Sequence, residues 1–324
     1  MAAPCRPASI CASSRRAASP SSGASCSAAA APSARPRALA RIARRSDIEA
    51  SGGSPHASSR RRTWWKRPER MELVTLGTGT VAPSATRTGA CHWVGRGSRQ
   101  VLLDCGPGAL HRMATFGLPW QDVTHVILSH FHPDHYAELP LLVYALKHTS
   151  PTPRREPLLI LGPPGVVRLV KALAEGYGTW LLDPGFPIGI LDVRDGEPFP
   201  LDGELSLETF PVPHTTESVA LSLSAPEGRL VYTGDTGPSA ELGRWAAGCD
   251  LLLAECSLPE SAAIDIHLTP ERAGELAQAA RARRLVLTHF YPPVETTDPA
   301  RAAAARFDGP VAAARDGDRF TIGG

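Results

Sequence analysis

From residue 71 onward the chain alternates short apolar runs with longer segments whose apolar residues recur at helical spacing. Short runs rich in Val, Ile and Leu are typical of strands buried in a sheet. They predict strands over residues 73–76, 91–94, 100–104, 126–128, 157–161, 205–210, 220–224, 230–233, 251–254 and 285–288. Helices are expected from about Ala109, over residues 139–147 and 165–176, and from Pro270, with Thr269 as its capping residue. This order of elements predicts a layered α/β fold.

The first 70 residues differ in composition from the rest of the chain. They are mostly Ala, Ser, Pro and Arg with almost no aliphatic periodicity, so they cannot bury enough apolar surface to offset the chain entropy lost on folding. We therefore expect a disordered tail over residues 1–70 and one folded domain over residues 71–324. Such a tail resembles an organelle transit peptide, but it also fits translated upstream DNA in a GC-rich bacterium. The second interpretation is favoured because Met71 opens directly into a strand.

Charge is divided unevenly between these two parts. The tail holds 14 of the 34 Lys and Arg residues and 3 of the 32 Asp and Glu residues, so its formal charge is +11 and that of the body is −9. The overall charge of +2 therefore hides an acidic body. An acidic body repels polyanions, and this argues against nucleic acid as the main partner of the folded part.

Apolar patterning and cysteine usage bear on the compartment. The sequence has no secretory signal and no apolar run of about 18 residues, so we expect a soluble, cytoplasmic protein with no membrane partner; import into an organelle by the tail is the alternative. Three of the seven cysteines lie in the tail. The others lack CxxC spacing and are predicted to be buried thiols in a reducing compartment: Cys91, Cys105, Cys249 and Cys256.

Residues 129–135, Ser-His-Phe-His-Pro-Asp-His, place three imidazoles and one carboxylate directly after a predicted strand. Side chains two apart in an extended loop point the same way, so His130 and His132 are expected to share one metal ion. Asp134 and His135 would then turn toward a second ion. So many ligand-type residues in so few positions are rare in a solvated polar loop, and the segment predicts a metal site.

Further ligand-type side chains stand where later strands end. His214, Asp235, Glu255 and His289 each follow a predicted strand. A lone histidine such as His214 is more often a packing or surface residue, but the first ion still lacks a third protein ligand. Asp235 can span two ions with its two oxygens, and an Asx-turn is the alternative explanation.

Asp104 ends another predicted strand and has two possible roles. It can accept backbone amides and hold the metal loop, or it can cap the helix that begins near Ala109. Four histidines have no such placement and are assigned to packing or the surface: His92, His111, His125 and His148.

Taken together, these motifs resemble the ribonuclease Z-like branch of the metallo-β-lactamase superfamily. The resemblance covers nearly all of residues 71–324 and implies a four-layer αββα sandwich. It rests on motifs in the family's order: Leu76–Thr80 with Arg87, Asp104-Cys105-Gly106, the HxHxDH run of residues 130–135, His214, Gly234-Asp235-Thr236, Glu255, His267-Leu268-Thr269 and Leu287-Thr288-His289.

The resemblance also implies roles for individual residues. It places His130, His132 and His214 on one zinc ion, Asp134, His135 and His289 on the other, and Asp235 between them. It further implies that His267, oriented by Glu255, protonates the leaving oxygen. Leu268 replaces the Ser that the family usually has after this histidine, so a role of His267 in capping a turn stays open.

The implied activity is that of a dinuclear zinc hydrolase in which a hydroxide shared by the ions attacks the substrate and Asp134 orients it. Manganese or iron would suit the same ligands. Ribonuclease Z grips precursor tRNA with a long arm between the residues that match His214 and Asp235, and this chain has only a short connection there. A phosphodiesterase acting on a small or cyclic phosphodiester is therefore favoured over a tRNA 3′-processing endoribonuclease.

Other partners and functions stay open. The same ions would serve thioester or lactam hydrolysis, and a non-hydrolytic metal-binding or redox module is an alternative of another class. We expect a small-molecule phosphodiester or ester as substrate, with RNA as the alternative, and a homodimer.

Overall fold

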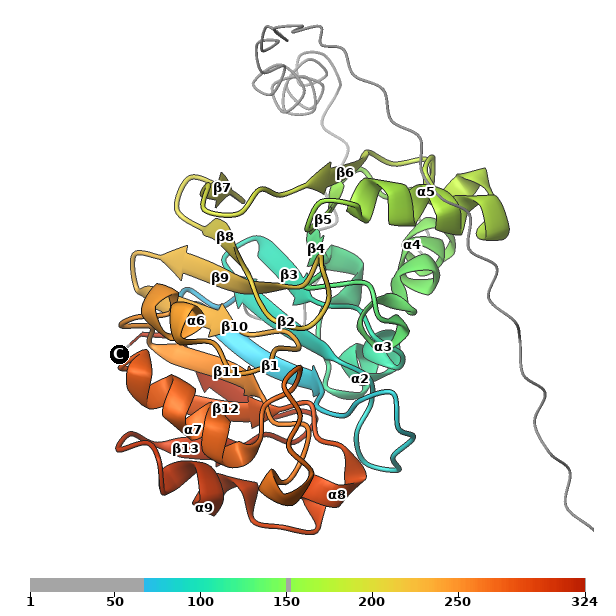
Figure 1. Ribbon diagram of the computed structural model, residues 1–324. Helices are drawn as coiled ribbons and strands as arrows, with labels where there is room; N and C mark the ends of the chain where they lie inside the picture. Colours follow the sequence, from blue (N-terminus) through green and yellow to red (C-terminus); the bar gives the residue numbers. More distant parts are fainter. Residues whose placement is uncertain (1–66, 150–152, 324) are drawn as a thin grey trace, which may run out of the picture. The chain divides into compact units, whose positions relative to one another are not determined.

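The computed structural model describes residues 67–149 and 153–323, and its strands form two seven-stranded sheets (Figure 1). In spatial order the first sheet contains β14 (Arg319–Thr321), β1 (Glu72–Gly77), β2 (Cys91–Arg96), β3 (Arg99–Leu103), β4 (His125–Ile127), β5 (Leu158–Gly162) and β6 (Ile188–Asp192). The second contains β13 (Val311–Ala313), β12 (Leu285–Thr288), β11 (Leu251–Glu255), β10 (Gly228–Tyr232), β9 (Val219–Ala225), β8 (Ser206–Pro211) and β7 (Phe199–Pro200). The tail expected over residues 1–70 lies almost entirely outside the described residues.

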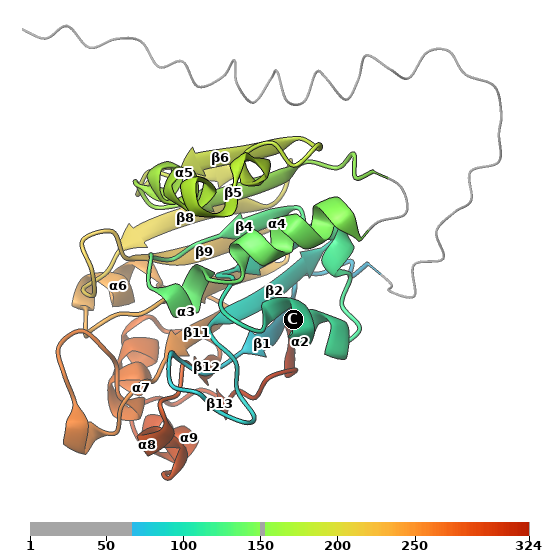
Figure 2. The same ribbon diagram turned by 90° about the vertical axis from the view of Figure 1, so that its right-hand side faces the viewer.

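Helices cover the outer faces of both sheets (Figures 1 and 2). The first sheet carries α2 (Ala109–Thr115), α4 (Leu139–His148) and α5 (Val166–Tyr177), and the second carries α6 (Ala240–Trp245), α7 (Pro270–Ala279) and α9 (Pro299–Ala304). Two shorter helices, α3 (Pro133–Tyr136) and α8 (Pro292–Glu295), follow strand ends. The four-layer αββα sandwich implied by the sequence motifs is confirmed.

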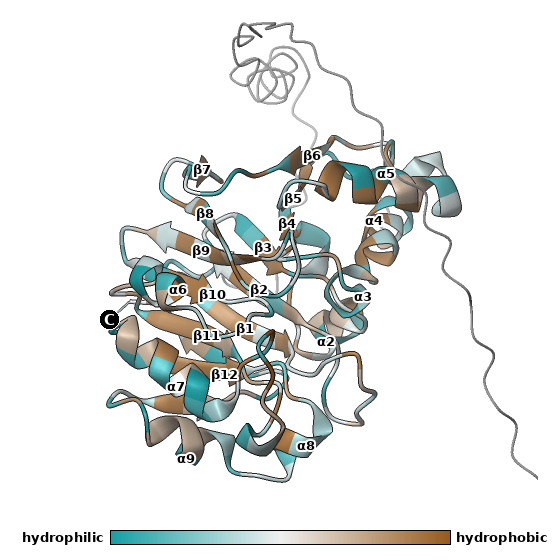
Figure 3. Ribbon diagram, viewed as in Figure 1, coloured by the Kyte–Doolittle hydropathy of each residue, from teal (hydrophilic) through white to brown (hydrophobic). Residues whose placement is uncertain are grey.

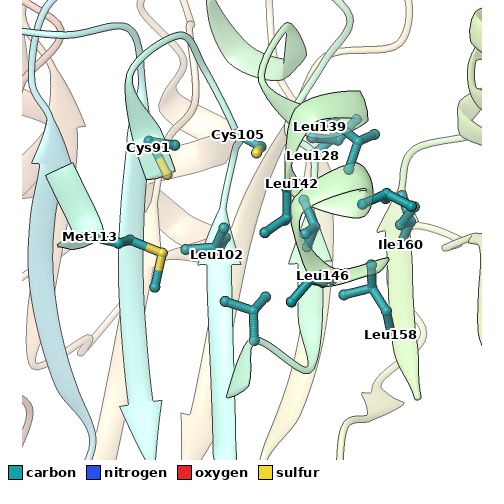
Figure 4. Packing of buried hydrophobic residues seen from close by; sticks show 14 of the residues in the cluster. Cys91, Leu102, Cys105, Met113, Leu128, Leu139, Leu142, Leu146, Leu158 and Ile160 are labelled. Atoms are coloured by element: carbon teal, nitrogen blue, oxygen red, sulfur yellow. The ribbon is translucent and has the colours of Figure 1, made fainter. Parts of the chain in front are cut away.

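Successive side chains of a strand point to opposite faces of the sheet, so each strand contributes to two layers of the core. In β3, Val101 and Leu103 belong to the core between the sheets, whereas Leu102 packs against the helices outside the first sheet. Figure 4 shows Leu102 among the leucines of this outer layer, with Met113 from α2 beside it. The apolar colouring of the central strands in Figure 3 follows from this burial on both faces.

All predicted strands and helices are present, with ends that differ by a few residues. The prediction of an extended loop over residues 129–135 is wrong in part. The second half of this loop is helical, because Pro133 stands at the first turn of α3. The sequence did not predict β6, β7, β13, β14, α6, α8 or α9. All four cysteines of the described residues are free and buried. In residues 67–149 and 153–323, every helix is too short or too polar to cross a membrane.

Strand direction determines where the loops meet. In the second sheet β10, β11 and β12 are mutually parallel, and β8 runs with them because β9 is antiparallel to both β8 and β10. In the first sheet β4 is parallel to β3 and β5. The loops that follow β8, β10, β11 and β12 therefore lie at one edge of the second sheet, where ligand-type side chains can converge.

Candidate metal centre

The seven predicted ligands come from loops of both sheets. The first sheet provides four of them after β4, and the second sheet provides one each after β8, β10 and β12. The structure brings them together into two groups: His130, His132, His214 and Asp235; and Asp134, His135 and His289. Within each group the candidate ligand atoms all lie within 4.8 Å of one another.

In the first group, three imidazole nitrogens and one carboxylate oxygen converge. His132 Nδ1 lies 3.1 Å from His130 Nε2 and 3.1 Å from His214 Nε2. Asp235 Oδ2 lies 3.9 Å from His130 Nε2 and 3.8 Å from His214 Nε2. All four atoms lie within 4.8 Å of one another, which is close enough for them to share one ion.

In the second group, His135 Nε2 lies 3.3 Å from His289 Nε2. Asp134 Oδ2 is 3.8 Å from the nitrogen of His135 and 3.5 Å from that of His289. Asp235 Oδ1 is 3.3 Å from both of these nitrogens. Asp235 thus directs one oxygen to each group.

The spacing and chemistry of these atoms fit divalent cations. Ligands at about 2.0–2.1 Å from a tetrahedral zinc ion are about 3.3 Å apart, which is close to the separations found within each group. Asp235 Oδ1 is buried and has no hydrogen-bond partner. A buried carboxylate oxygen is costly without a partner, and a cation would satisfy it. Imidazole and carboxylate ligands suit zinc, manganese and iron alike.

Hydrogen bonds to the second ring nitrogen orient most of these imidazoles. His130 Nδ1 lies 3.0 Å from Ser129 Oγ, and His135 Nδ1 lies 2.7 Å from Asp104 Oδ2. His214 Nδ1 donates to the Ile266 carbonyl at 2.9 Å, and His289 Nδ1 lies 2.9 Å from Ser257 Oγ. Each ring therefore turns Nε2 toward the cluster. His132 differs, because its Nδ1 faces the cluster.

Asp104 is the buried carboxylate that holds the metal loop. Its Oδ1 accepts the Ser129 N–H at 2.7 Å, and its Oδ2 accepts the Ser129 hydroxyl and the Tyr232 hydroxyl, each at 2.9 Å. Together with the bond to His135, these contacts decide between the two predicted roles. The helix-capping alternative is wrong, because the residue that precedes α2 is Gly108.

Glu255 connects His267 to the candidate ligands through hydrogen bonds. Its Oε1 lies 2.8 Å from His267 Nδ1 and also accepts the Thr236 N–H at 2.7 Å. Its Oε2 accepts the Ser257 hydroxyl, whose oxygen lies 2.9 Å from His289 Nδ1. One carboxylate thus orients His267 directly and His289 through Ser257.

In the structure, His267 does not cap the turn that begins the next helix, α7. The residue that caps α7 is Thr269, whose hydroxyl accepts the Arg272 N–H at 3.2 Å. His267 instead stacks on His289 with ring centroids 6.1 Å apart and lies 4.8 Å from the ring of His214.

Sequence reasoning missed Ser257 and Tyr232 as parts of the site. Both are fully buried and hydrogen-bond to the carboxylates that orient the ligands. A serine at the same strand end as Glu255 was the one available signal for Ser257. Tyr232 lies inside a strand whose pattern is apolar, so its hydroxyl gave no signal.

Burial and charge act differently on the candidate ligands. Burial alone would lower the pKa of His135, but the carboxylates of Asp235 and Asp104 raise it well above its ordinary value. Other ligands are shifted toward the forms that bind a cation. Burial lowers the pKa of His130 to about 2 and also lowers the pKa of His214. Burial alone would raise the pKa of Asp134, but hydrogen bonding to His289 and the nearby His135 lower it to about 2. Neutral imidazoles and an ionised carboxylate are the forms that coordinate metals.

The four remaining histidines lie away from the cluster, in agreement with the prediction. His111 and His148 are exposed, and His92 and His125 are buried in the sheets. Neither ring nitrogen of His92 has a hydrogen-bond partner, and Nε2 of His125 has none. None of these four histidines belongs to the two groups of candidate ligands.

Comparison with known proteins places this arrangement in a family. A family profile described as a beta-lactamase superfamily domain matches residues 99–290, which include all seven candidate ligands. The uncharacterized protein ML1173 of Mycobacterium leprae is 38% identical over 228 residues, which cover 68% of this chain and 78% of that protein. Ribonuclease Z of Mycolicibacterium gilvum is 30% identical over 265 residues, covering 74% of this chain and 91% of the enzyme.

The fold has solved counterparts as well. The metallo-beta-lactamase fold protein YhfI of Bacillus subtilis superposes with a TM-score of 0.67 at 22% identity. The superposition covers 78% of this chain and 99% of YhfI. At this identity the likeness concerns the fold alone.

Proposed function

Because the chain belongs to the metallo-β-lactamase superfamily, in its ribonuclease Z-like branch of metal-dependent hydrolases, we propose that it hydrolyses a small or cyclic phosphodiester with two zinc ions bound. The observation that carries the proposal is the Glu255–His267 pair beside the two groups of candidate ligands. A proton donor at this place serves a reaction in which a poorly stabilised alkoxide leaves.

The ligand groups suggest how the ions would be held. His130, His132 and His214 would hold one ion, Asp134, His135 and His289 the other, and Asp235 would give one oxygen to each. When bound, two such ions supply Lewis acidity that activates water as a nucleophile and stabilises the charge developing on the phosphate.

Protein side chains would carry the remaining steps. The carboxylate of Asp134 would accept a hydrogen bond from the attacking water and orient it. His267 holds Nδ1 against Glu255, so its Nε2 is the atom that can give a proton to the leaving oxygen. Burial alone would lower the pKa of His267, but the hydrogen bond to Glu255 and its negative charge raise it above its ordinary value, which favours the protonated imidazole that a proton donor needs.

The short connection between His214 and Asp235 supports a small substrate. It consists of β9 and β10 with a tight turn between them, and it leaves no room for a tRNA-gripping arm. The body of the chain, with a formal charge of −9, also disfavours a polyanion, since phosphate contacts supply much of nucleic-acid affinity. tRNA 3′-end processing is the second candidate, and the similarity to ribonuclease Z favours it.

A substrate panel tests the proposal. The zinc-loaded protein would be assayed on cyclic nucleotides, a precursor tRNA, a β-lactam and a thioester, with Asp235→Ala as the inactive control. We expect turnover of a cyclic nucleotide that disappears in the control. Cleavage of the precursor tRNA at higher kcat/KM than any small phosphodiester would favour the second candidate instead.

A further inference from the structure

Exposed apolar side chains gather in two places on the described residues. Four belong to α4, α5 and the turn after α5, and three belong to the loops after β1 and β11, the second of which leads to His267. The second set comprises Val81, Ile264 and Ile266. Large apolar side chains that stay exposed next to a reactive site are typical of a substrate subsite.

Ile266 lies directly at the metal centre. Its carbonyl accepts a hydrogen bond from His214 Nδ1 at 2.9 Å, and it immediately precedes His267. A Cβ atom on Gly237 would lie 1.7 Å from the Asp265 carbonyl oxygen, so this loop packs tightly on the strand end that carries Asp235. The backbone is thus fixed while 45% of the Ile266 residue surface stays exposed.

Tyr291 is an aromatic neighbour of His267. Its ring centroid lies 6.3 Å from that of His267 and 6.0 Å from that of His289, edge-on to both. Its N–H donates to the Ser257 carbonyl at 3.3 Å, and its hydroxyl interacts with the side chain of Thr80. The ring is therefore held in place and remains half-buried.

His267 thus has an aromatic ring beside it and directly follows an exposed aliphatic residue in the chain. The oxygen that His267 would protonate carries the organic part of the substrate, so that part would lie near His267 and these two residues. We propose that Ile266 and Tyr291 form a subsite for a planar, largely apolar group joined to the scissile phosphate, as in the nucleoside part of a cyclic nucleotide. This inference rests on the proposed phosphodiesterase activity.

The charges around the subsite agree with a substrate that has no second phosphate. The guanidinium of Arg272 is bound to the Ile264 carbonyl at 3.0 Å, and that of Arg87 is bound to the Ala314 carbonyl at 2.7 Å and to Glu295. The carboxylate of Asp265 stands exposed between Ile264 and Ile266. A further phosphate would meet this negative charge, whereas a planar base would gain affinity by stacking on the tyrosine.

Matched substrates test the subsite. Cyclic AMP would be compared with the 3′,5′-cyclic phosphate of the same sugar without a base, because both have the same scissile bond. For Ile266→Ser and Tyr291→Ala we expect kcat/KM to fall roughly tenfold on cyclic AMP, mainly through KM, and to change less than about twofold on the base-free substrate. On cyclic AMP, Tyr291→Phe should lose less kcat/KM than Tyr291→Ala, since the ring remains and only the hydroxyl that interacts with Thr80 is lost.

Leu141→Ser provides the matched control, because Leu141 is also a large exposed aliphatic residue but lies on α4. It should leave both substrates unaffected. Equal losses on both substrates in Ile266→Ser and Tyr291→Ala would overturn the subsite.

The subsite and the proposed function fail in different ways. If the wild-type protein hydrolyses neither substrate, the proposed function fails, and binding of adenosine measured by calorimetry then decides the subsite. Weaker binding by Tyr291→Ala than by the wild-type protein supports it. Equal binding by the two proteins overturns it.

Discussion

Replacing Asp104 by alanine should destabilise the fold and weaken metal binding together. The side chain is fully buried and accepts hydrogen bonds from the Ser129 N–H, the Ser129 hydroxyl, the Tyr232 hydroxyl and His135 Nδ1. Alanine would leave all four of these donors without their partner. The effect should therefore exceed that of an average core substitution.

The magnitude follows from the hydrogen bonds that alanine cannot make. A buried donor left without its acceptor costs about 1–3 kcal/mol, and breaking a buried charged pair costs about 3–5 kcal/mol. The donors are neighbours, so their costs do not simply add. We expect the free energy of unfolding to fall by about 4 kcal/mol, which is a large share of the roughly 5–15 kcal/mol typical of a domain. Zinc affinity should fall about 10–100-fold, because His135 loses its orientation.

Urea unfolding followed by circular dichroism in excess chelator measures the first effect without any contribution from metal. Asp104→Asn separates hydrogen bonding from backbone strain, since Asp104 has a φ of 59° that asparagine tolerates better than alanine. Asparagine should recover only part of the loss, because its amide cannot accept on both atoms. Asp183→Ala, at an exposed aspartate, is the control. A change below about 0.5 kcal/mol for Asp104→Ala would refute the reasoning.

Three further perturbations test other parts of the site and core. Asp235→Ala should lose both metal ions, because each group loses an oxygen; two ions per chain retained in native mass spectrometry would contradict this. His267→Ala should keep both ions but lose roughly 10²–10⁴ in rate on a cyclic nucleotide and little on a p-nitrophenyl phosphodiester, whose leaving group needs little protonation; equal losses on both substrates would return His267 to a structural role. Burial lowers the pKa of His125 from 6.5 to about 4, so the unfolded chain binds more protons between these values. The free energy of unfolding should therefore be unaffected by His125 above pH 6.5 and should fall by about 3 kcal/mol as the pH drops toward 4. Urea titrations should show a weaker pH dependence for His125→Phe than for the wild-type protein.

The candidate ligands could be predicted because their signals are local. Four stand in one short run, and His214, Asp235 and His289 each lie within three residues of the end of a strand. Parallel strands carry such residues to a common edge without any knowledge of distant contacts. The division of the two Asp235 oxygens between the groups could not be predicted, because it depends on side-chain geometry.

The missed elements have weaker signals in the sequence. The edge strands β13 and β14 are three residues long, and their stability comes from pairing with β12 and β1. Their patterns are too short to show a period of two. Gly189 interrupts the apolar run of β6, and such breakers argue against a strand when only the sequence is considered.

The arrangement of the ligands connects the centre to the packing of the sandwich. One group combines His130 and His132 from the first sheet with His214 and Asp235 from the second. The other combines Asp134 and His135 from the first sheet with His289, which follows β12 of the second sheet, and Asp235 Oδ1 lies 3.3 Å from both imidazoles of this group. Each ion would therefore cross-link the two sheets at the edge where their loops meet. An ion that binds only the folded state stabilises it, and the gain grows with the logarithm of the ratio of free ion concentration to Kd. The Tyr232–Asp104 hydrogen bond already joins the sheets at this edge, so the protein holds both halves of the centre near each other before any cation binds.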